Sequence, residues 1–222
     1  MNRGIIAVLT SRSSWFIPYA RKFVSRLKKS GYQARLFTSH ENIPEKYNIV
    51  FMLSYFRIIE KSYLDKREHN IVVHESDLPE GKGWAPLFWQ ILKGQNVIPV
   101  VLFEASQKID AGDIYIKSRI GLRGNELHDE IRSKQAAKSM ELCMKFLSDM
   151  DKLKPLRQRG RSTVFRRRSP SDSILNINKS IKEQFNQLRI SDNKNYPAFF
   201  RYKNSEYVLK IYKKDNKGRI MG

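Results

Sequence analysis

The chain has 222 residues, of which 41% are hydrophobic, and a formal net charge of +20 at pH 7. This length predicts one domain, or one domain with a small appendage, and the apolar content suffices for a core. The single cysteine, Cys143, excludes a disulfide framework, fits a reducing cytoplasmic compartment and lies in an apolar stretch typical of a core. No apolar run reaches the about 20 residues that span a bilayer, so we expect a soluble protein without a membrane partner.

The positive charge favours an anionic partner, such as a nucleic acid, a phosphorylated small molecule or an acidic surface. It is spread along the chain, with a local excess in the tract 154–168. That tract lacks the interleaved aromatic residues of a single-strand binder, and the chain has neither zinc-finger spacing nor a basic zipper. We therefore expect no stable nucleic-acid partner. An equal alternative to a specific anionic partner is that the basic surface only promotes solubility and nonspecific attraction.

Short apolar runs recur along the first 150 residues. Such runs are typical of strands that are buried on both faces of a parallel sheet. We expect strands at residues 4–9, 32–37, 47–53, 70–76, 96–105 and 113–122.

Apolar residues at helical spacing predict helices between these runs. One covers residues 14–31 and ends at Gly31, and a second covers residues 85–94 and ends at Gly94. The clearest helix covers residues 125–150. Its apolar stripe consists of Leu127, Ile131, Met140, Met144 and Leu147. Strands that alternate with helices indicate an α/β fold with a largely parallel sheet.

The composition changes at about residue 151, where a basic, turn-rich linker begins. Beyond the linker, the pattern predicts a helix over residues 176–190. Two strands, 198–204 and 206–214, are expected to form a hairpin. We therefore expect a core at residues 1–150 and a small α+β extension at residues 151–222.

His74 lies where the fourth predicted strand gives way to a turn, at the start of the stretch HESDLPEGKGWAP. Pro79, Gly81 and Gly83 predict a tight loop there. Ligands of open α/β sheets bind beyond the carboxyl ends of the strands, so His74 is a candidate catalytic residue and Lys82 could contact a phosphate. Taken alone, a histidine at a strand end is more often structural.

A second loop, KIDAGDIY, follows the fifth predicted strand and carries Asp110 and Asp113 around Gly112. A carboxylate on a neighbouring strand end could orient the His74 imidazole and stabilise its charged form, as in a proton-transfer pair. The alternative is that both aspartates are turn residues, which the Asp-x-Gly-Asp pattern also favours.

Together these motifs resemble those of the formyltransferases that use N10-formyltetrahydrofolate. The family pattern is Asn-x-His-x-Ser-Leu-Leu-Pro, then Gly-x-x-Pro, then Asp-x-Gly-Asp. His74 matches the family histidine, Asp110 the catalytic aspartate, Pro79 the loop proline, and Gly83 with Pro86 the Gly-x-x-Pro. The resemblance covers nearly the whole chain. It implies a Rossmann-like fold with a mostly parallel sheet, helices on both faces and a small C-terminal extension.

The resemblance also implies a reaction. An unprotonated amine attacks the formyl carbon, His74 stabilises the tetrahedral oxyanion, and Asp110 polarises His74 and relays the amine proton. It implies no metal. The segment 53–65 resembles the one whose backbone holds the pterin ring of folate. Folate contacts are expected at Tyr55, Phe56, Arg57, Ile58, Ile59, Ala105 and Asp113.

Among acceptors, the resemblance favours a nucleotide-linked amino sugar of the UDP-4-amino-sugar type. The stretches RRRSPSDSILN and LRISDNKNYPAFF are similar to those of sugar-modifying members, and too few residues follow for the C-terminal barrel of the transfer-RNA enzymes. Asp77 stands where the family usually has leucine, a variant associated with pseudaminic-type (nonulosonic) sugar pathways. Substrate contacts are expected at Ser11, Arg12, Ser13, Ser76, Lys82, Gly83 and Trp84.

Several residues keep alternative interpretations. Ser13 or Ser14 could cap the helix that follows instead of contacting the substrate. The stretch 166–169 (RRRS) is either a surface loop or a diphosphate contact. His128 in ELHDE suggests a metal ligand, but on an amphipathic helix we expect it on a solvated face.

The chain departs from the family pattern at Val72, where the family has an asparagine whose amide helps to hold the oxyanion. Asn70 lies on the same strand face but about 6.5 Å further back, so it is a poor substitute. Three interpretations remain: His74 alone stabilises the oxyanion, another donor replaces the amide, or activity is weak. The alternatives to a sugar formyltransferase are an impaired protein that only binds folate or nucleotide-sugar, a formyltransferase for another anionic amine, and a nucleic-acid binder. The sequence leaves a homodimer open.

Overall fold

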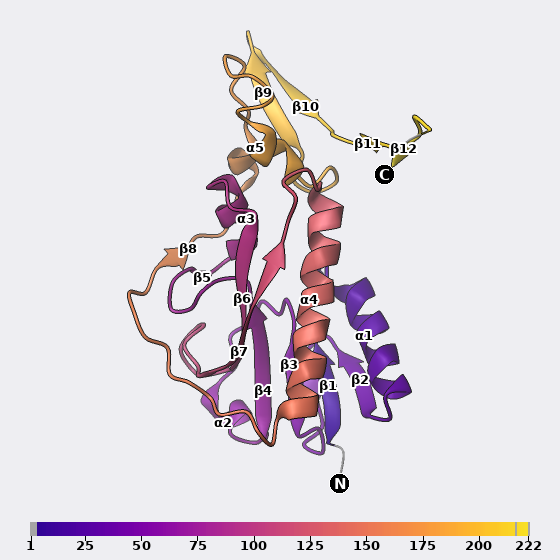
Figure 1. The fold of residues 1–222 in the computed structure, drawn as a ribbon, viewed down its shortest axis with the longest axis vertical. Coiled ribbons are helices and arrows are strands. Elements are labelled where there is room, and N and C mark those ends of the chain that lie inside the picture. Colours follow the sequence, from indigo (N-terminus) through magenta and orange to yellow (C-terminus); the bar gives the residue numbers. More distant parts are fainter. Residues whose placement is uncertain (1–3, 216, 222) are drawn as a thin grey trace. The chain divides into compact units, whose positions relative to one another are not determined.

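The computed structural model describes residues 4–215 and 217–221 (Figure 1). Its contacts divide the chain into two compact units. The first unit consists of residues 1–82, 99–118 and 136–164, and the second consists of residues 83–98, 119–135 and 165–222. The composition instead predicts a boundary at about residue 150, between a core and a small extension. That boundary stays a prediction.

A six-stranded sheet has the order β2-β1-β3-β4-β6-β7. Strands β1 to β4 run parallel, whereas β6 pairs with β4 in antiparallel orientation, with His74 opposite Val101. The sheet is thus mostly parallel, as predicted, and all six expected strands are present. Their bounds are β1 Ile5–Leu9, β2 Gln33–Phe37, β3 Ile49–Met52, β4 His69–His74, β6 Val97–Glu104 and β7 Ile114–Gly121.

Helices cover both faces of the parallel part of the sheet, which confirms the predicted architecture. On one face, α1 (Ile17–Lys29) and α4 (His128–Asp149) pack on β3. The Phe51 ring lies 5.8 Å from that of Phe23 in α1 and 6.3 Å from that of Phe146 in α4. The other face carries the short helices η1 (His40–Asn42) and α2 (Lys61–Leu64). Apolar residues in and next to these helices form a buried cluster with residues of β3.

The buried stripe of α4 differs in part from the predicted one. Ile131 and Leu147 are buried as expected, but Met140 and Met144 are only half-buried. At about 100° per residue, both methionines lie to one side of the buried stripe. Its other buried members are Gln135, Ala136, Ser139, Leu142, Cys143 and Phe146. Among the described residues, no helix combines the length and apolar character needed to cross a bilayer.

The second unit contains α3 (Pro86–Leu92), η2 (Pro170–Ser173) and α5 (Phe185–Arg189). Strands β9 (Ala198–Tyr202) and β10 (Ser205–Leu209) form the predicted hairpin. Lys203 in its turn has a φ of 53°, in the left-handed region. The chain then runs on to the short pair β11 (Lys213–Lys214) and β12 (Ile220–Met221).

The predicted helix over residues 176–190 is mostly wrong, because only α5 is helical. Gln184 accepts a hydrogen bond from the Asn176 amide at 2.6 Å and donates one to the Asn176 carbonyl at 2.9 Å. Glu183 likewise accepts from the Ser180 amide and hydroxyl. These side chains satisfy backbone groups locally and so compete with helical hydrogen bonds.

A buried charge organises the second unit. The Glu126 side chain is 5% exposed and accepts hydrogen bonds from the Arg123 and Gly124 amides and from Lys134 Nζ at 2.6 Å. Burial alone would raise the pKa of this carboxyl. The bonds from Lys134 and Arg123 outweigh it and lower the pKa of Glu126 to about 2.

Arg189 completes this network from α5. Its side chain is fully buried, with Nη1 at 3.7 Å from a Glu126 oxygen and Nη2 donating to the Asn96 side chain at 2.6 Å. Removing one partner of such a pair leaves a buried charge uncompensated, which is far more costly than losing an exposed pair.

We predict that Glu126→Gln destabilises the second unit by about 3 kcal/mol, since it leaves the Arg189 guanidinium buried without its counter-charge. Because the folded-state pKa of Glu126 is depressed to about 2, the difference from wild type is full above about pH 4.5 and shrinks as the pH falls towards 2. Urea unfolding, followed by tryptophan fluorescence, to which Trp84 and Trp89 of this unit contribute beside Trp15, measures it. Glu141→Gln, at an exposed residue of α4, is the control and should change stability by no more than about 0.5 kcal/mol.

Candidate active site

His74 is the last residue of β4 and is 7% exposed. Its Nε2 lies 2.8 Å from the Gly81 carbonyl oxygen. A carbonyl only accepts, so Nε2 carries the hydrogen in this arrangement. The loop that supplies this carbonyl turns tightly, as predicted, with Gly81 at a φ of 76°. The ring orientation of His74 therefore depends on the position of the Gly81 peptide.

The structure brings Asp110 to His74. Asp110 Oδ2 lies 3.9 Å from His74 Nε2, and the two side chains are 14% and 9% exposed. A carboxylate this close to an imidazole, in surroundings this shielded from water, can stabilise the charge of an imidazolium. The catalytic roles of both residues stay predictions.

The two residues meet by a different route from the one the sequence suggests. Because β6 is antiparallel to β4, its carboxyl end at Glu104 lies opposite Ile71, about 10 Å back along β4 from His74. Asp110 reaches His74 because the loop 105–113 folds back along the sheet. Asp110 itself has a φ of 47°, in the left-handed region.

Gly112 permits this fold-back. A Cβ at residue 112 would lie 1.6 Å from the Glu104 carbonyl oxygen, so only glycine fits there. The Gln158 side-chain amide holds the same turn by donating to the Asp110 carbonyl at 3.0 Å and to the Gly112 carbonyl at 2.8 Å. Sequence reasoning missed Gln158, since nothing local in the basic tract indicates a contact 46 residues away.

The predicted folate segment lies beside the loop that follows β1. Ser11 Oγ accepts a hydrogen bond from the Phe56 amide at 2.8 Å, and the Ser11 amide donates to the Ser54 carbonyl. Tyr55 OH lies 2.7 Å from His40 Nδ1. Strands β1, β3 and β4 are parallel, so these loops and His74 lie at the same edge of the sheet.

Other side chains of this segment divide into exposed and buried ones. Arg57 is exposed and forms an ion pair with Glu41, and Ile58 is 70% exposed. Ile59 is 7% exposed and belongs to the apolar cluster on this face, so its side chain is part of the core. The prediction that Ile59 contacts folate can hold only through its backbone.

Ala105 and Asp113 flank the turn that carries Asp110. The Ala105 amide donates to the Asn70 carbonyl at 2.6 Å, and the Asp113 carbonyl accepts from the Glu104 amide at 3.0 Å. Both backbone positions are therefore fixed against neighbouring strands.

The predicted substrate residues of the amino-terminal loop differ in exposure. Ser11 is buried, whereas Arg12 and Ser13 are exposed. Ser14 is buried, and its Oγ accepts from the Phe16 amide at 3.0 Å, directly before α1. Of the two serines considered as caps, Ser14 therefore has the local structural contact. Ser13 stays a predicted substrate contact.

Ser76 and Lys82 lie in the loop after His74. Ser76 is 2% exposed, and among the described residues its hydroxyl has no hydrogen-bond partner. The Lys82 amide donates to the Thr163 carbonyl at 2.9 Å, which begins the short pair of β5 (Lys82–Gly83) with β8 (Val164–Phe165).

In the second unit, the arginines of the stretch 166–169 are engaged within the chain. Arg166 forms an ion pair with Asp172 and covers the Trp89 ring at 4.9 Å. Arg167 covers the Trp84 ring at 4.8 Å. These contacts fit the packed surface loop rather than a free diphosphate contact.

His128 is not on a solvated face, so that expectation is wrong. Its side chain is 14% exposed, and its ring stacks on Phe88 at 5.5 Å. Burial lowers the pKa of His128, and the nearby Arg132 lowers it further. Within residues 4–215 and 217–221, no group of three or more His, Cys, Asp or Glu side chains could hold a metal ion.

Val72 lies where the family asparagine would be. It is half-buried and packs against an apolar cluster that includes Leu78, Val101 and Phe103. Asn70 is no substitute, because its Nδ2 donates to the Leu64 carbonyl at 2.9 Å. The amide of Asn70 is therefore used within the core.

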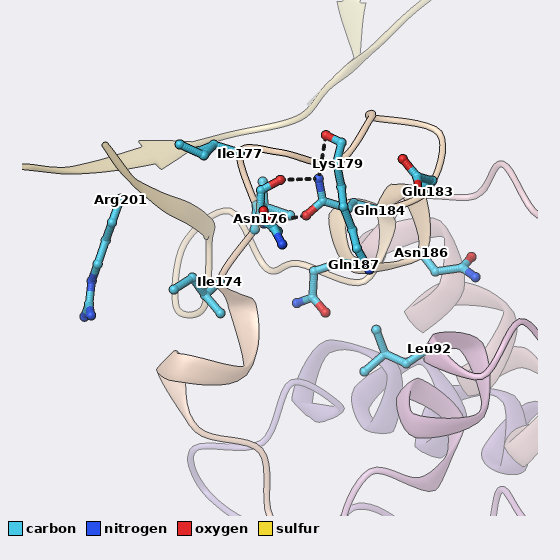
Figure 2. Close-up of a pocket in the computed structure, with 11 residues that line it drawn as sticks. Leu92, Ile174, Asn176, Ile177, Lys179, Glu183, Gln184, Asn186, Gln187 and Arg201 are labelled. Atoms are coloured by element: carbon cyan, nitrogen blue, oxygen red, sulfur yellow. Dashed lines mark hydrogen bonds between the residues drawn. The ribbon is translucent and has the colours of Figure 1, made fainter. Parts of the chain in front are cut away.

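A cavity of about 580 Å³ lies within the second unit (Figure 2). Gln184, which bonds to Asn176, lines it together with Leu92, Ile174 and Arg201. None of the residues predicted to bind folate or substrate lines this cavity.

Comparison with known proteins agrees with the motifs. The Formyl transferase family matches residues 22–147, which is more than half of the chain and includes His74 and Asp110. The chain belongs to this formyl transferase family. Among its curated relatives is the methionyl-tRNA formyltransferase of Rickettsia prowazekii, 29% identical over 119 residues, which are 53% of this chain and 39% of the relative. The chain thus spans less than half the length of the curated relatives it matches.

Several solved structures share the fold. A methionyl-tRNA formyltransferase from Clostridium thermocellum has a TM-score of 0.77 at 23% identity, covering 98% of this chain and 96% of its own. HypX from Aquifex aeolicus in complex with tetrahydrofolic acid has a TM-score of 0.73 at 16% identity, covering 98% and 40%. A sugar N-formyltransferase from a Shewanella species has a TM-score of 0.67 at 12% identity, covering 93% and 97%.

We predict that Gly112→Ala destabilises the first unit by more than about 2 kcal/mol, because the new Cβ would overlap the Glu104 carbonyl and force the turn away from β6. Gly121→Ala, on β7, meets no atom within 4 Å and should change stability by less than about 0.5 kcal/mol. Denaturant unfolding measures both. Equal stability of the two variants would contradict the fold-back described for this loop.

Proposed function

We propose that this protein transfers a formyl group from N10-formyltetrahydrofolate to the amine of a nucleotide-linked amino sugar. The observation that carries the proposal is the approach of His74 Nε2 to Asp110 Oδ2 at 3.9 Å, both side chains being largely shielded from water. Membership of the formyl transferase family supports the reaction type.

In the proposed reaction, the unprotonated amine attacks the formyl carbon and the carbonyl oxygen becomes an oxyanion. His74 Nε2 is held by the Gly81 carbonyl and faces Asp110. This leaves Nδ1 of an imidazolium as the donor for the oxyanion, while the Asp110 carboxylate stabilises the imidazolium charge. Collapse of the tetrahedral intermediate breaks the bond between the formyl carbon and N10 of folate. The proton lost by the amine passes through the His74–Asp110 pair to that nitrogen.

The folate co-substrate would bind at the edge of the sheet that carries His74. The segment Ser54–Ile58 follows β3, is tied to Ser11 after β1, and presents a half-exposed Phe56 ring. The HypX structure with tetrahydrofolic acid, which shares the fold, supports a folate site in this type of domain.

Two acceptors compete. A nucleotide-linked amino sugar is supported by the sugar N-formyltransferase fold neighbour and by the affinity of a basic surface for a diphosphate. Methionyl-tRNA is the second candidate, since the curated relatives are methionyl-tRNA formyltransferases and the chain has a net charge of +20. We favour the sugar, because the basic tract lacks features of a nucleic-acid binder.

We predict that the protein formylates at least one nucleotide-linked 4-amino sugar when supplied with N10-formyltetrahydrofolate. Mass spectrometry of a panel of such sugars, with methionyl-tRNA as a further acceptor, detects the added formyl group. His74→Ala and Asp110→Asn should each lower kcat by at least about 100-fold, because they remove the oxyanion donor and its charge partner. Formylation of methionyl-tRNA alone would select the second candidate. Folate binding without transfer to any acceptor would indicate a binding protein.

We predict that Val72→Asn raises kcat about tenfold, because residue 72 lies on the same strand face as His74 and an amide there adds an oxyanion donor. Val72→Ile is the matched control, which keeps an apolar side chain and adds no donor. Steady-state kinetics with a saturating acceptor compares the three proteins. Unchanged or lower turnover of a folded Val72→Asn protein would mean that another group already holds the oxyanion.

A further inference from the structure

The segment Leu156–Thr163, here called the strap, crosses both loops that carry the proposed catalytic pair. It belongs to the basic tract 154–168. At its start, Leu156 pairs with Ile114, each amide donating to the other carbonyl, at 2.8 and 2.9 Å. Two residues on, Gln158 Nε2 donates to the carbonyls of Asp110 and Gly112. This end of the strap fixes the turn that presents Asp110.

The other end of the strap fixes the loop that follows His74. Thr163 Oγ1 accepts a hydrogen bond from the Gly81 amide at 2.8 Å. The Thr163 amide donates to the Pro79 carbonyl at 3.3 Å, and its carbonyl accepts from the Lys82 amide at 2.9 Å. Three bonds thus join one residue of the strap to this loop.

These bonds reach the imidazole through a single peptide group. The peptide that joins Gly81 to Lys82 receives the His74 Nε2–H on its carbonyl oxygen and donates its N–H to the Thr163 carbonyl. Hydrogen bonds at both ends of one peptide polarise and strengthen each other. The position of Thr163 therefore sets the position of the acceptor that orients His74.

We propose that Gln158 and Thr163 are positioning residues, which set the distance and orientation between His74 and Asp110 from one continuous strap. Since the role concerns the catalytic pair, this inference rests on the proposed formyl transfer. A displacement of about 1 Å between reacting groups costs up to about 100-fold in rate. The strap acts on kcat through geometry, because neither side chain is among the groups that act on the substrate in the proposed reaction.

The chain offers closely matched variants for each contact. Thr163→Val keeps the shape of threonine and removes the hydroxyl, whereas Thr163→Ser keeps the hydroxyl. Gln158→Met keeps the length of glutamine and removes both N–H donors. Arg157→Gln removes a charge from an exposed neighbour on the strap without touching either contact.

Steady-state kinetics with the acceptor that the wild type formylates is the first test. Gln158→Met and Thr163→Val should lower kcat by 10- to 100-fold, with each KM within about threefold of wild type. Thr163→Ser and Arg157→Gln should stay within about twofold. In a His74→Ala background, Gln158→Met should have no further effect on the residual rate, because no imidazole is left to position. A further loss in that background, or kcat of either single variant within twofold of wild type, would overturn the proposal.

Amide hydrogen exchange, followed by mass spectrometry, is the second test and needs no substrate. Thr163→Val should speed exchange in peptides spanning residues 76–84, and Gln158→Met should do so in peptides spanning residues 105–114, with exchange in α1 unchanged. Unchanged exchange in both regions would overturn the strap whatever the reaction is. Conversely, the wild type could formylate none of the acceptors while the two variants still show these exchange changes. That result would reject the proposed function and support the strap.

Discussion

The close approach of Gly112 to the Glu104 carbonyl is the constraint on which the candidate site depends. Because β6 runs antiparallel to β4, the chain leaves the sheet at the wrong end for Asp110 to meet His74. Only a turn that lies against the strand it has just left returns the carboxylate to the imidazole. Such a turn has no room for a Cβ, and a Cβ at residue 112 would overlap the Glu104 carbonyl. The glycine of the Asp-x-Gly-Asp motif is thus explained by packing, whereas the catalytic role of Asp110 stays a proposal.

Around that turn, the first unit uses backbone hydrogen bonds rather than charges to hold its polar groups. The His74 imidazole, the Gly81 peptide and Thr163 form one connected chain of donors and acceptors. His74 and Gly81 are buried, whereas Thr163 is exposed. At the buried end of this chain, hydrogen bonds are stronger than in water and favour one arrangement over its alternatives. A rigid imidazole needs less reorganisation when charge develops on a substrate, which is the physical basis of electrostatic catalysis.

The second unit differs from the first in that it buries a pair of opposite charges, Arg189 and Glu126. Arg189 is fully buried beside Glu126, whose carboxylate also accepts hydrogen bonds from two backbone amides and from Lys134. Other cations of this unit lie over aromatic rings, as Arg166 does over Trp89 and Arg167 over Trp84. Such stacking uses the weakly hydrated guanidinium as a flat packing surface. Part of the net charge of +20 is therefore structural, and the charge by itself does not define a partner.

The sequence by itself determined the strands, the main helices and the identity of the two candidate catalytic residues. Apolar runs and glycine stops are local signals, and the bounds of β1, α1 and β6 follow from them. The helix predicted over residues 176–184 is absent because side chains there bond to nearby backbone, as Gln184 does to Asn176. These bonds replace helical hydrogen bonds and leave the spacing of the apolar residues unchanged, so the spacing does not reveal them. Tertiary structure alone decided that β6 is antiparallel, that Ile59 and His128 are packed, and that Gln158 and Thr163 contact the two loops. Those contacts join residues far apart in the chain. A contact between two distant segments produces no periodic pattern of residues in either segment, so the sequence does not predict it.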